Sequence, residues 1–246
     1  MSGFLSRKYP RLLIVFVGPQ GVGKTAHALL LSRELKSLGC DVHITSLIGY
    51  TVFHLKFIGL LNRICKTNVV AIKFYEDLPP QPSASPEIYR RLFSLLILLH
   101  FIGYLMSLIK YKLLRIFHRV LIEHEGFIFK QIADLHFMAG YAKVKSSSLT
   151  GRLLKRFNVL LLSALLKNLV IIVRLEADIS SLQQRYVGRL HIEPAHYLSF
   201  QNRIYEKLLK WLDSLSNINV LNINSDRRVV EVHSDIFNFI HPFLRG

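Results

Sequence analysis

Cysteine and acidic residues are scarce in this chain of 246 residues. The two cysteines, Cys40 and Cys65, are too few and too scattered for a disulfide framework or a zinc site, so we expect a reducing compartment. Only 16 acidic residues accompany 32 lysines and arginines, which leaves a net charge of +16. Such an excess favours anionic partners (nucleotides, nucleic acid or an acidic membrane surface), unless it is a generally basic surface with no dedicated partner.

Sequence signals that define other classes of protein are also missing. The apolar run at residues 12–17 is too short for a secretory signal, so we expect a cytoplasmic protein. No RNA- or DNA-binding motif is present, and only the charge supports a nucleic-acid-stimulated ATPase. We therefore expect no specific nucleic acid partner. The length suits a single domain over residues 1–246.

One motif, by contrast, is complete. The phosphate-binding pattern G-x-x-x-x-G-K-T is matched in order by Gly18, Pro19, Gln20, Gly21, Val22, Gly23, Lys24 and Thr25. The glycines let the backbone turn tightly and bring its N–H groups close to phosphate oxygens. Lys24 would reach the β- and γ-phosphates of ATP, and the Thr25 hydroxyl is placed to ligate Mg²⁺. No N-K-x-D motif is present to argue for guanine, and the base preference stays open.

The segments on either side of this loop have the required order of strand, turn and helix. Residues 11–17 are almost wholly apolar, as expected for a parallel strand buried on both faces. Residues 24–38 carry apolar side chains at helical spacing, and Gly39 follows as a natural helix-ending residue. The amino terminus of that helix adds its own attraction for anions. These flanks predict a nucleotide-binding turn rather than an ordinary glycine-rich one.

Strands alternate with helices along the rest of the chain. We expect strands at residues 11–17, 41–47, 118–123, 169–175 and 219–223. We expect helices at residues 24–38, 53–66, 88–117, 127–137, 151–166, 196–213 and 229–243, with a further helix capped by Asp178. Residues 69–75 are a short strand or a helix end, residues 77–87 a proline-rich loop, and residues 143–150 an exposed basic connection. This alternation predicts an α/β fold whose parallel sheet is covered by helices on both faces, with its ligand site at the carboxyl ends of the strands.

Residues 92–109 contain no charged side chain and are flanked by Arg90, Arg91 and Lys110. Their length is borderline for a membrane span. A single span would separate the phosphate loop from the acids that follow the third strand, and basic residues at both ends indicate no orientation. Two other interpretations stay open: a buried core helix, or a helix with one apolar face toward a membrane or a protein partner. Peripheral membrane contact and a homodimer are hypotheses at this point.

Two acids follow the third strand, in the order Glu123-His124-Glu125-Gly126. An acid after an apolar strand is well placed to hold the Mg²⁺ shell opposite the phosphate loop, or to accept a proton from an attacking hydroxyl. We predict Glu123 as the first choice and Glu125 as the second, one serving the metal and the other the acceptor. His124 either contacts a phosphate or is the hydrogen-bond partner of the carboxylates. The alternative is an acidic strand-to-helix turn without chemistry.

Two arginines, Arg185 and Arg189, lie four residues apart at the end of a predicted helix. Planar guanidinium groups can close over phosphates during transfer, and residues 185–195 would then form a small lid. The alternative is a solvated face, which is the commoner environment of paired arginines. A separate basic run is interpreted as solvated or membrane-facing and comprises Lys143, Lys145, Arg152, Lys155 and Arg156.

With these residues in place, the chain resembles the thymidylate-kinase-like branch of the P-loop kinases. The resemblance begins at the phosphate loop, residues 18–25. It continues in residues 170–178 with Leu182, Arg185 and Arg189, which resemble the family's strand, helix start and lid arginines. It ends with the helix after the lid (Glu193, Tyr197, Gln201 and Tyr205) and with residues 222–226, which resemble the turn near the adenine. The resemblance implies a three-layer fold with sheet order 2-3-1-4-5 and Mg-ATP as the phosphoryl donor.

The departures from that family fall on the acceptor side. Glu123-His124 stands where the family has Asp-Arg, residues 45–48 replace its Thr-Arg-Glu-Pro, and residues 92–109 replace its arginine-bearing helix. We therefore predict a phosphotransferase with an intact donor half, in which the catalytic residues are Lys24, Glu123, Arg185 and Arg189. Its acceptor is a nucleotide, a nucleoside, or a more apolar alcohol or phosphate. The alternative function is an ATP-binding switch or scaffold on a membrane or protein partner, with little phosphotransfer.

Overall fold

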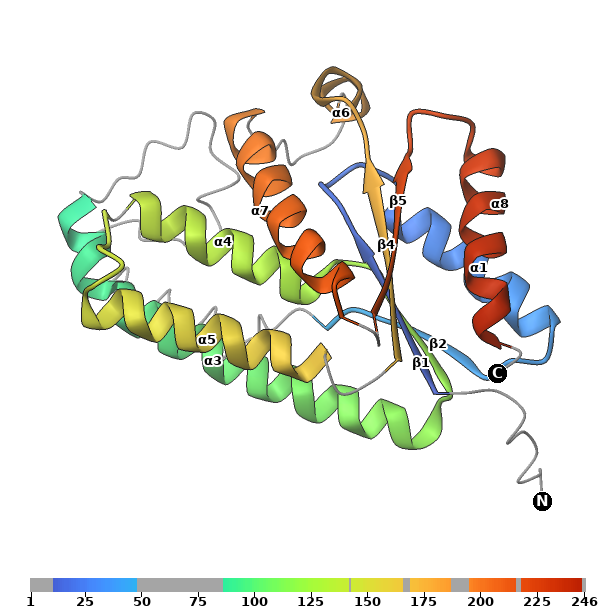
Figure 1. Ribbon diagram of the computed structural model, residues 1–246, viewed down its shortest axis with the longest axis horizontal. Helices are drawn as coiled ribbons and strands as arrows, with labels where there is room; N and C mark the ends of the chain where they lie inside the picture. Colours follow the sequence, from blue (N-terminus) through green and yellow to red (C-terminus); the bar gives the residue numbers. More distant parts are fainter. Residues whose placement is uncertain are drawn as a thin grey trace.

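The computed structural model describes residues 11–47, 86–141, 143–165, 169–186, 195–215 and 218–244. The predictions for residues 53–66 and 69–75, and those for Arg189 and Glu193, lie outside these ranges, as do most of the proline-rich loop and of the lid. Figure 1 shows the described helices arranged around one central sheet.

Five parallel strands form the sheet, in the order β2-β3-β1-β4-β5. The strands are β1 (Leu12–Val17), β2 (Val42–Thr45), β3 (Val120–Glu123), β4 (Leu169–Glu176) and β5 (Ile218–Asn224). Every residue of β1 and of β3 is buried, as their nearly unbroken apolar runs predict for central strands. The predicted order 2-3-1-4-5 is confirmed.

Alternate side chains of β1 face two separate hydrophobic cores, one on each side of the sheet. The core that contains Leu13 and Val15 lies under four helices: α3 (Pro86–Phe117), α4 (Phe127–Tyr141), α5 (Leu149–Leu165) and α7 (Ala195–Asp213). The core that contains Leu12 and Ile14 lies under α1 (Lys24–Ser37) and α8 (Val229–Ile240), and it also includes Leu182 and Tyr186 of α6 (Ile179–Tyr186). Helices therefore cover both faces of the sheet, as expected (Figure 1).

Small differences from the predicted boundaries have local causes. Helix α6 (Ile179–Tyr186) begins directly after Asp178, the predicted capping position. The last helix ends at Ile240 and continues as one 3₁₀ turn, His241–Leu244, instead of running to residue 243. Pro242 lacks the N–H group that an α-helix needs at that position. These differences leave the order of elements unchanged.

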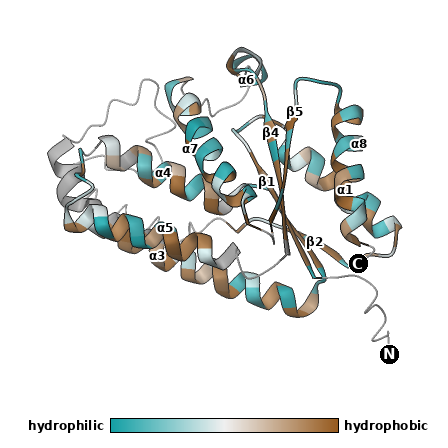
Figure 2. Cartoon of the chain, viewed as in Figure 1, coloured by the Kyte–Doolittle hydropathy of each residue, from teal (hydrophilic) through white to brown (hydrophobic). Residues whose placement is uncertain are grey.

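Helix α3 buries one side and exposes the other. Ile97 and Tyr104 are buried against the neighbouring helices, whereas Leu98 and Ile109 are each more than half exposed. Ile97–Phe117 is long and apolar enough to cross a membrane. However, 29% of the apolar window in this segment is buried inside the domain. Strand β3 also enters the sheet soon after the segment ends. Figure 2 shows apolar residues along most of this helix. Of the three interpretations of the apolar stretch, a helix with one exposed apolar face matches these observations.

Candidate nucleotide site

The phosphate loop follows β1 directly and depends on three glycines with positive φ. Gly18, Gly21 and Gly23 have φ angles of 146°, 82° and 98°. A Cβ atom at Gly18 would lie 2.3 Å from the carbonyl oxygen of Leu175, and one at Gly21 would lie 2.9 Å from the ring of Tyr186. At these two positions only glycine satisfies both the backbone conformation and the packing.

Lys24 is the first residue of α1, and its side chain folds back over the loop. Its ammonium group donates hydrogen bonds to the carbonyl oxygens of Gly18 at 2.8 Å and of Pro19 at 2.7 Å. The ammonium group therefore lies at the start of the loop, close to the amino terminus of α1, which also favours an anion. This arrangement places a positive charge beside the loop, and its contact with the β- and γ-phosphates stays a prediction.

Thr25 brings the loop into contact with the turn after β3. Its Oγ1 lies 3.2 Å from Nδ1 of His124, and β1 and β3 are neighbours with Val15 opposite Glu123. Burial lowers the pKa of His124 below its usual value; Glu125 partly offsets this effect, and the charge of Lys24 adds to it. This shift favours the neutral imidazole, which is a hydrogen-bonding group.

Glu123 is buried at the end of β3, and the backbone of the turn uses its carboxylate. The two oxygens accept hydrogen bonds from the N–H groups of Glu125 at 3.0 Å and of Gly126 at 2.8 Å. Gly126 has a φ of 66°, so these bonds hold a turn of unusual backbone conformation. The Glu123 carboxylate therefore lies at the carboxyl end of β3, where the sequence predicts a metal ligand.

Glu125 is tied to the segment after β2. The hydroxyl of Ser46 donates a hydrogen bond to Oε2 of Glu125. Lys110 of α3 donates in turn to the backbone carbonyl of Ser46 at 2.7 Å. The two predicted acids therefore have different surroundings. Glu123 is bonded to the backbone of its own turn, whereas Glu125 is bonded to Ser46, within the residues 45–48 that depart from the family's motif.

Arg185 is paired with the turn after β5. Its guanidinium donates to Oδ1 of Asp226 at 2.8 Å and to the carbonyl of Ser225 at 3.1 Å. Asp226 also accepts a hydrogen bond from the N–H of Asp178 at 2.9 Å. Arg185 thus joins α6 to the turn that the resemblance assigns to the adenine, and its predicted role over the transferred phosphate stays a prediction.

Tyr186 contacts the loop directly and was not singled out from the sequence. Its hydroxyl donates to the carbonyl of Gln20 at 2.7 Å, and its buried ring lies against Gly21. The sequence signal is only an aromatic residue beside Arg185, 166 positions after the loop. Nothing in that local pattern indicates a contact with the phosphate loop.

The resemblance positions on α7 pack inward. Tyr197, Gln201 and Tyr205 are all buried, and the Tyr197 hydroxyl donates a hydrogen bond to the buried Asp134 of α4. The amide of Gln201 donates to the Tyr197 hydroxyl at 3.2 Å, and Lys130 lies 3.6 Å from Asp134. In this structure these side chains hold α7 against α4.

Across the described ranges, no three His, Cys, Asp or Glu side chains converge in a metal-binding arrangement. Mg²⁺ bound together with a nucleotide takes most of its ligands from phosphate oxygens and water, and needs only one or two from the protein. Thr25 and the acidic turn, with Glu123 and Glu125, lie at one edge of the sheet and can supply that number. The donor set therefore fits Mg²⁺ with a polyphosphate at the loop.

Comparisons with known proteins bear on the fold. Structures of deoxyadenosine kinase from M. mycoides, one with bound dCTP and one with bound dATP, each match this chain with a TM-score of 0.54. The sequence identities are 14% and 15%, over 94% and 93% of this chain and 99% of each kinase chain. No family model and no curated protein matches the sequence. The chain therefore has the P-loop kinase fold, with the five-stranded sheet that the sequence predicted.

Proposed function

We propose that this chain is a kinase that uses Mg-ATP to phosphorylate a hydroxyl group of a nucleoside. The observation that carries the proposal is the approach of the phosphate loop to an acidic turn, with Thr25 Oγ1 3.2 Å from His124. A cation, a metal-ligating hydroxyl and carboxylates at one edge of a sheet are the groups that phosphoryl transfer requires. The P-loop kinase fold of the two deoxyadenosine kinase structures supports the same class of reaction.

On the donor side, Lys24 and the N–H groups of the loop would hold the β- and γ-phosphates. Thr25 with Glu123 or Glu125 would hold Mg²⁺, which neutralises phosphate charge when it is bound. Arg185 and Arg189 would close over the transferred group, where planar donors stabilise developing charge.

On the acceptor side, the residues favour a neutral hydroxyl over a phosphate. Residues 45–47 and 123–126 contain no lysine or arginine, although Lys110 of α3 donates to the Ser46 carbonyl. Glu125 contributes a carboxylate that accepts a hydrogen bond from Ser46. A carboxylate repels a nucleoside monophosphate but can accept the proton of an attacking hydroxyl. The name of the structural neighbours, deoxyadenosine kinase, also supports a nucleoside over the nucleotide that the thymidylate-kinase-like resemblance implies.

ADP release from Mg-ATP tests this proposal, with a panel of ribo- and deoxyribonucleosides and their monophosphates as acceptors. We expect turnover that depends on at least one nucleoside and is slower with its monophosphate. Lys24→Ala should lower kcat by about a hundredfold to a thousandfold, because a preorganised cation is lost from the transferring phosphates. Tight ATP binding without acceptor-stimulated turnover would contradict the proposal and would favour the switch or scaffold.

A matched pair of variants separates the roles of the two acids. Glu125→Gln keeps a hydrogen-bond acceptor for Ser46 but loses the base, so kcat should fall about a hundredfold while stability is unchanged. Glu123→Gln would turn an amide NH₂ toward a backbone N–H, so the free energy of unfolding should fall by about 2 kcal/mol. Urea unfolding and acceptor-dependent kinetics measure both effects. Full turnover in Glu125→Gln would refute the role of Glu125 as the base.

A further inference from the structure

Helix α3 exposes a continuous apolar stripe, which runs along the side away from the hydrophobic core. Spacings of three or four residues place its members on one side of the helix. The exposed members are Leu98, Ile102, Leu105, Met106, Ile109, Leu113, Ile116 and Phe117. Helix α5 lies alongside α3 (Figure 1) and adds the exposed leucines Leu149, Leu153 and Leu160. We call this surface the α3–α5 face.

The same two helices carry many cations and almost no acid. No aspartate or glutamate occurs between Glu87 and Glu123, or between Asp134 and Glu176. The exposed cations of α3 and α5 among the described side chains are Lys110, Lys112, Arg152, Lys155 and Arg156. An apolar stripe bordered by cations without compensating acids is typical of helices that lie in the surface of an acidic membrane.

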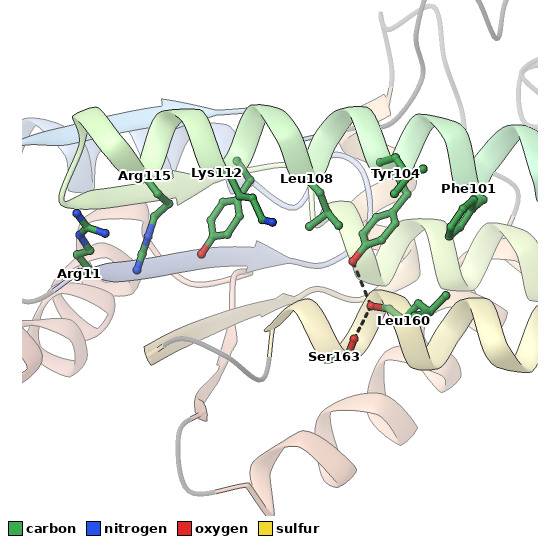
Figure 3. A pocket seen from close by; sticks show the side chains of 10 residues that line it. Arg11, Phe101, Tyr104, Leu108, Lys112, Arg115, Leu160 and Ser163 are labelled. Carbon is green, nitrogen blue, oxygen red and sulfur yellow. Dashed lines mark hydrogen bonds between the residues drawn. The ribbon is translucent and has the colours of Figure 1, made fainter.

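A cavity of about 530 Å³ lies between α3 and α5, beside the stripe. Figure 3 shows that its lining changes along α3, from Arg11 and Arg115 at one end to Tyr104 and Phe101 at the other. Leu105 and Leu160 line the cavity and are also 43% and 48% exposed, so the cavity adjoins the apolar surface. A cationic end and an apolar end suit an amphiphile with an anionic head group.

We propose that the α3–α5 face binds the surface of an anionic membrane, with the phosphate of an acidic phospholipid at the Arg11, Lys112 and Arg115 end of the cavity. The exposed stripe enters the boundary between head groups and acyl chains, where apolar area leaves water. The cations gain from the negative surface potential of the acidic leaflet.

The charges and the fold disfavour the other occupants of this face. A second copy of the chain would set one acid-free cationic surface against another, so the two copies would repel. In a membrane span, Lys110, Lys112 and Arg115 would lie in or beside the hydrocarbon, and α3 would have to leave α4 and α5. Contact with a membrane surface satisfies both the apolar stripe and the cations.

The proposed membrane site is independent of the proposed function. Arg11 precedes β1, whereas Gly18 follows it, so the cationic end of the cavity and the phosphate loop lie at opposite edges of the sheet. A strand of this length separates its ends by about 20 Å. The cationic end of the cavity therefore lies away from the phosphate loop, and membrane binding is measured without nucleotide.

Cosedimentation with lipid vesicles tests the proposal with the purified full chain at low salt. We expect it to pellet with vesicles of equal parts phosphatidylcholine and phosphatidylglycerol, and to stay in solution with phosphatidylcholine alone. Lys112→Gln with Arg156→Gln should lower the partition coefficient about 25-fold, at about fivefold per cation. As a control, Arg33→Gln with Lys36→Gln removes the same charge from α1, on the other side of the sheet. This pair should change the partition coefficient by less than about twofold.

A second pair of variants tests the apolar stripe. Ile109→Ser with Leu113→Ser replaces two exposed side chains and should weaken vesicle binding about tenfold, with the melting temperature unchanged. The proposal is overturned if the wild-type protein stays in solution with the acidic vesicles, or if the two charge pairs have equal effects. It is also overturned if light scattering finds a dimer that the serine pair dissociates, because a second copy would then occupy this face.

Discussion

Gly18 and Gly39 both have positive φ, but only Gly18 is packed against a neighbouring backbone. A Cβ at Gly18 would lie 2.3 Å from the carbonyl oxygen of Leu175, whereas nothing lies within 4 Å of a Cβ at Gly39. Gly18→Ala should therefore lower the free energy of unfolding by about 3 kcal/mol, and Gly39→Ala by about 1 kcal/mol. Urea unfolding measures both values. Equal losses would show that φ alone, and not the contact with Leu175, requires glycine in the loop.

The phosphate loop and the two acids, Glu123 and Glu125, differ in how much of their structure the sequence predicts. The chemistry of the loop belongs to consecutive residues, so the conformations of its glycines follow from the motif. Glu123 and Glu125 are two residues apart with similar local patterns, and only their partners distinguish them. One partner is the backbone of the turn, and the other is Ser46 on a segment far away in sequence.

Helix α6 contacts the loop through Tyr186. Tyr186 donates a hydrogen bond to the carbonyl of Gln20 and so holds the loop in its turned conformation. Tyr186→Phe removes that bond without opening a cavity, so ATP affinity should fall about fivefold, the equivalent of one ordinary hydrogen bond. Isothermal titration with ATP measures the change.

A matched control for this variant is Tyr104→Phe. The Tyr104 hydroxyl also donates to a backbone carbonyl, that of Leu160, but it does so between α3 and α5. Tyr104→Phe should cost similar stability and leave ATP affinity unchanged. A loss of ATP affinity in both variants would mean that the effect of Tyr186 is general destabilisation.

Among the elements, the long helix shows what periodicity does not predict. The apolar stretch at residues 92–109 was compatible with a core helix, a surface helix and a membrane span, because all three need a similar composition. The position of β3 in the sheet and the packing of α3 on α5 separate these interpretations. Similarly, Arg185 lies at the end of α6 as expected, but its partner, Asp226, lies in the turn after β5, 41 residues further along the chain.

At the scale of the whole molecule, burial lowers the pKa of four histidines in the described ranges, His27, His43, His124 and His136, below 6.5. The unfolded chain therefore binds more protons than the folded protein as the pH falls through this value. The stability that these neutral histidines contribute is complete above pH 6.5 and is lost below it. The melting temperature should fall between neutral pH and about pH 5.5.

Thermal unfolding at constant ionic strength measures this pH dependence. His136→Gln keeps a hydrogen-bonding partner for Asn158, which lies 2.7 Å from the ring nitrogen of His136, and removes one titrating group. Its melting temperature should vary less with pH than that of the wild type. A wild-type melting temperature that is constant or rises on acidification would contradict the expected burial of these groups.

By itself, the sequence determined the order of the elements, the parallel sheet and the conformation of the phosphate loop. These features depend on residues that are close in the chain: an apolar strand, a glycine-rich turn and a helix start. Only the tertiary structure decided the contact of Tyr186 with the loop, the pairing of Arg185 with Asp226 and the exposed side of α3. Each of these joins segments that are distant in sequence, and such partners are set by how the layers pack around the sheet.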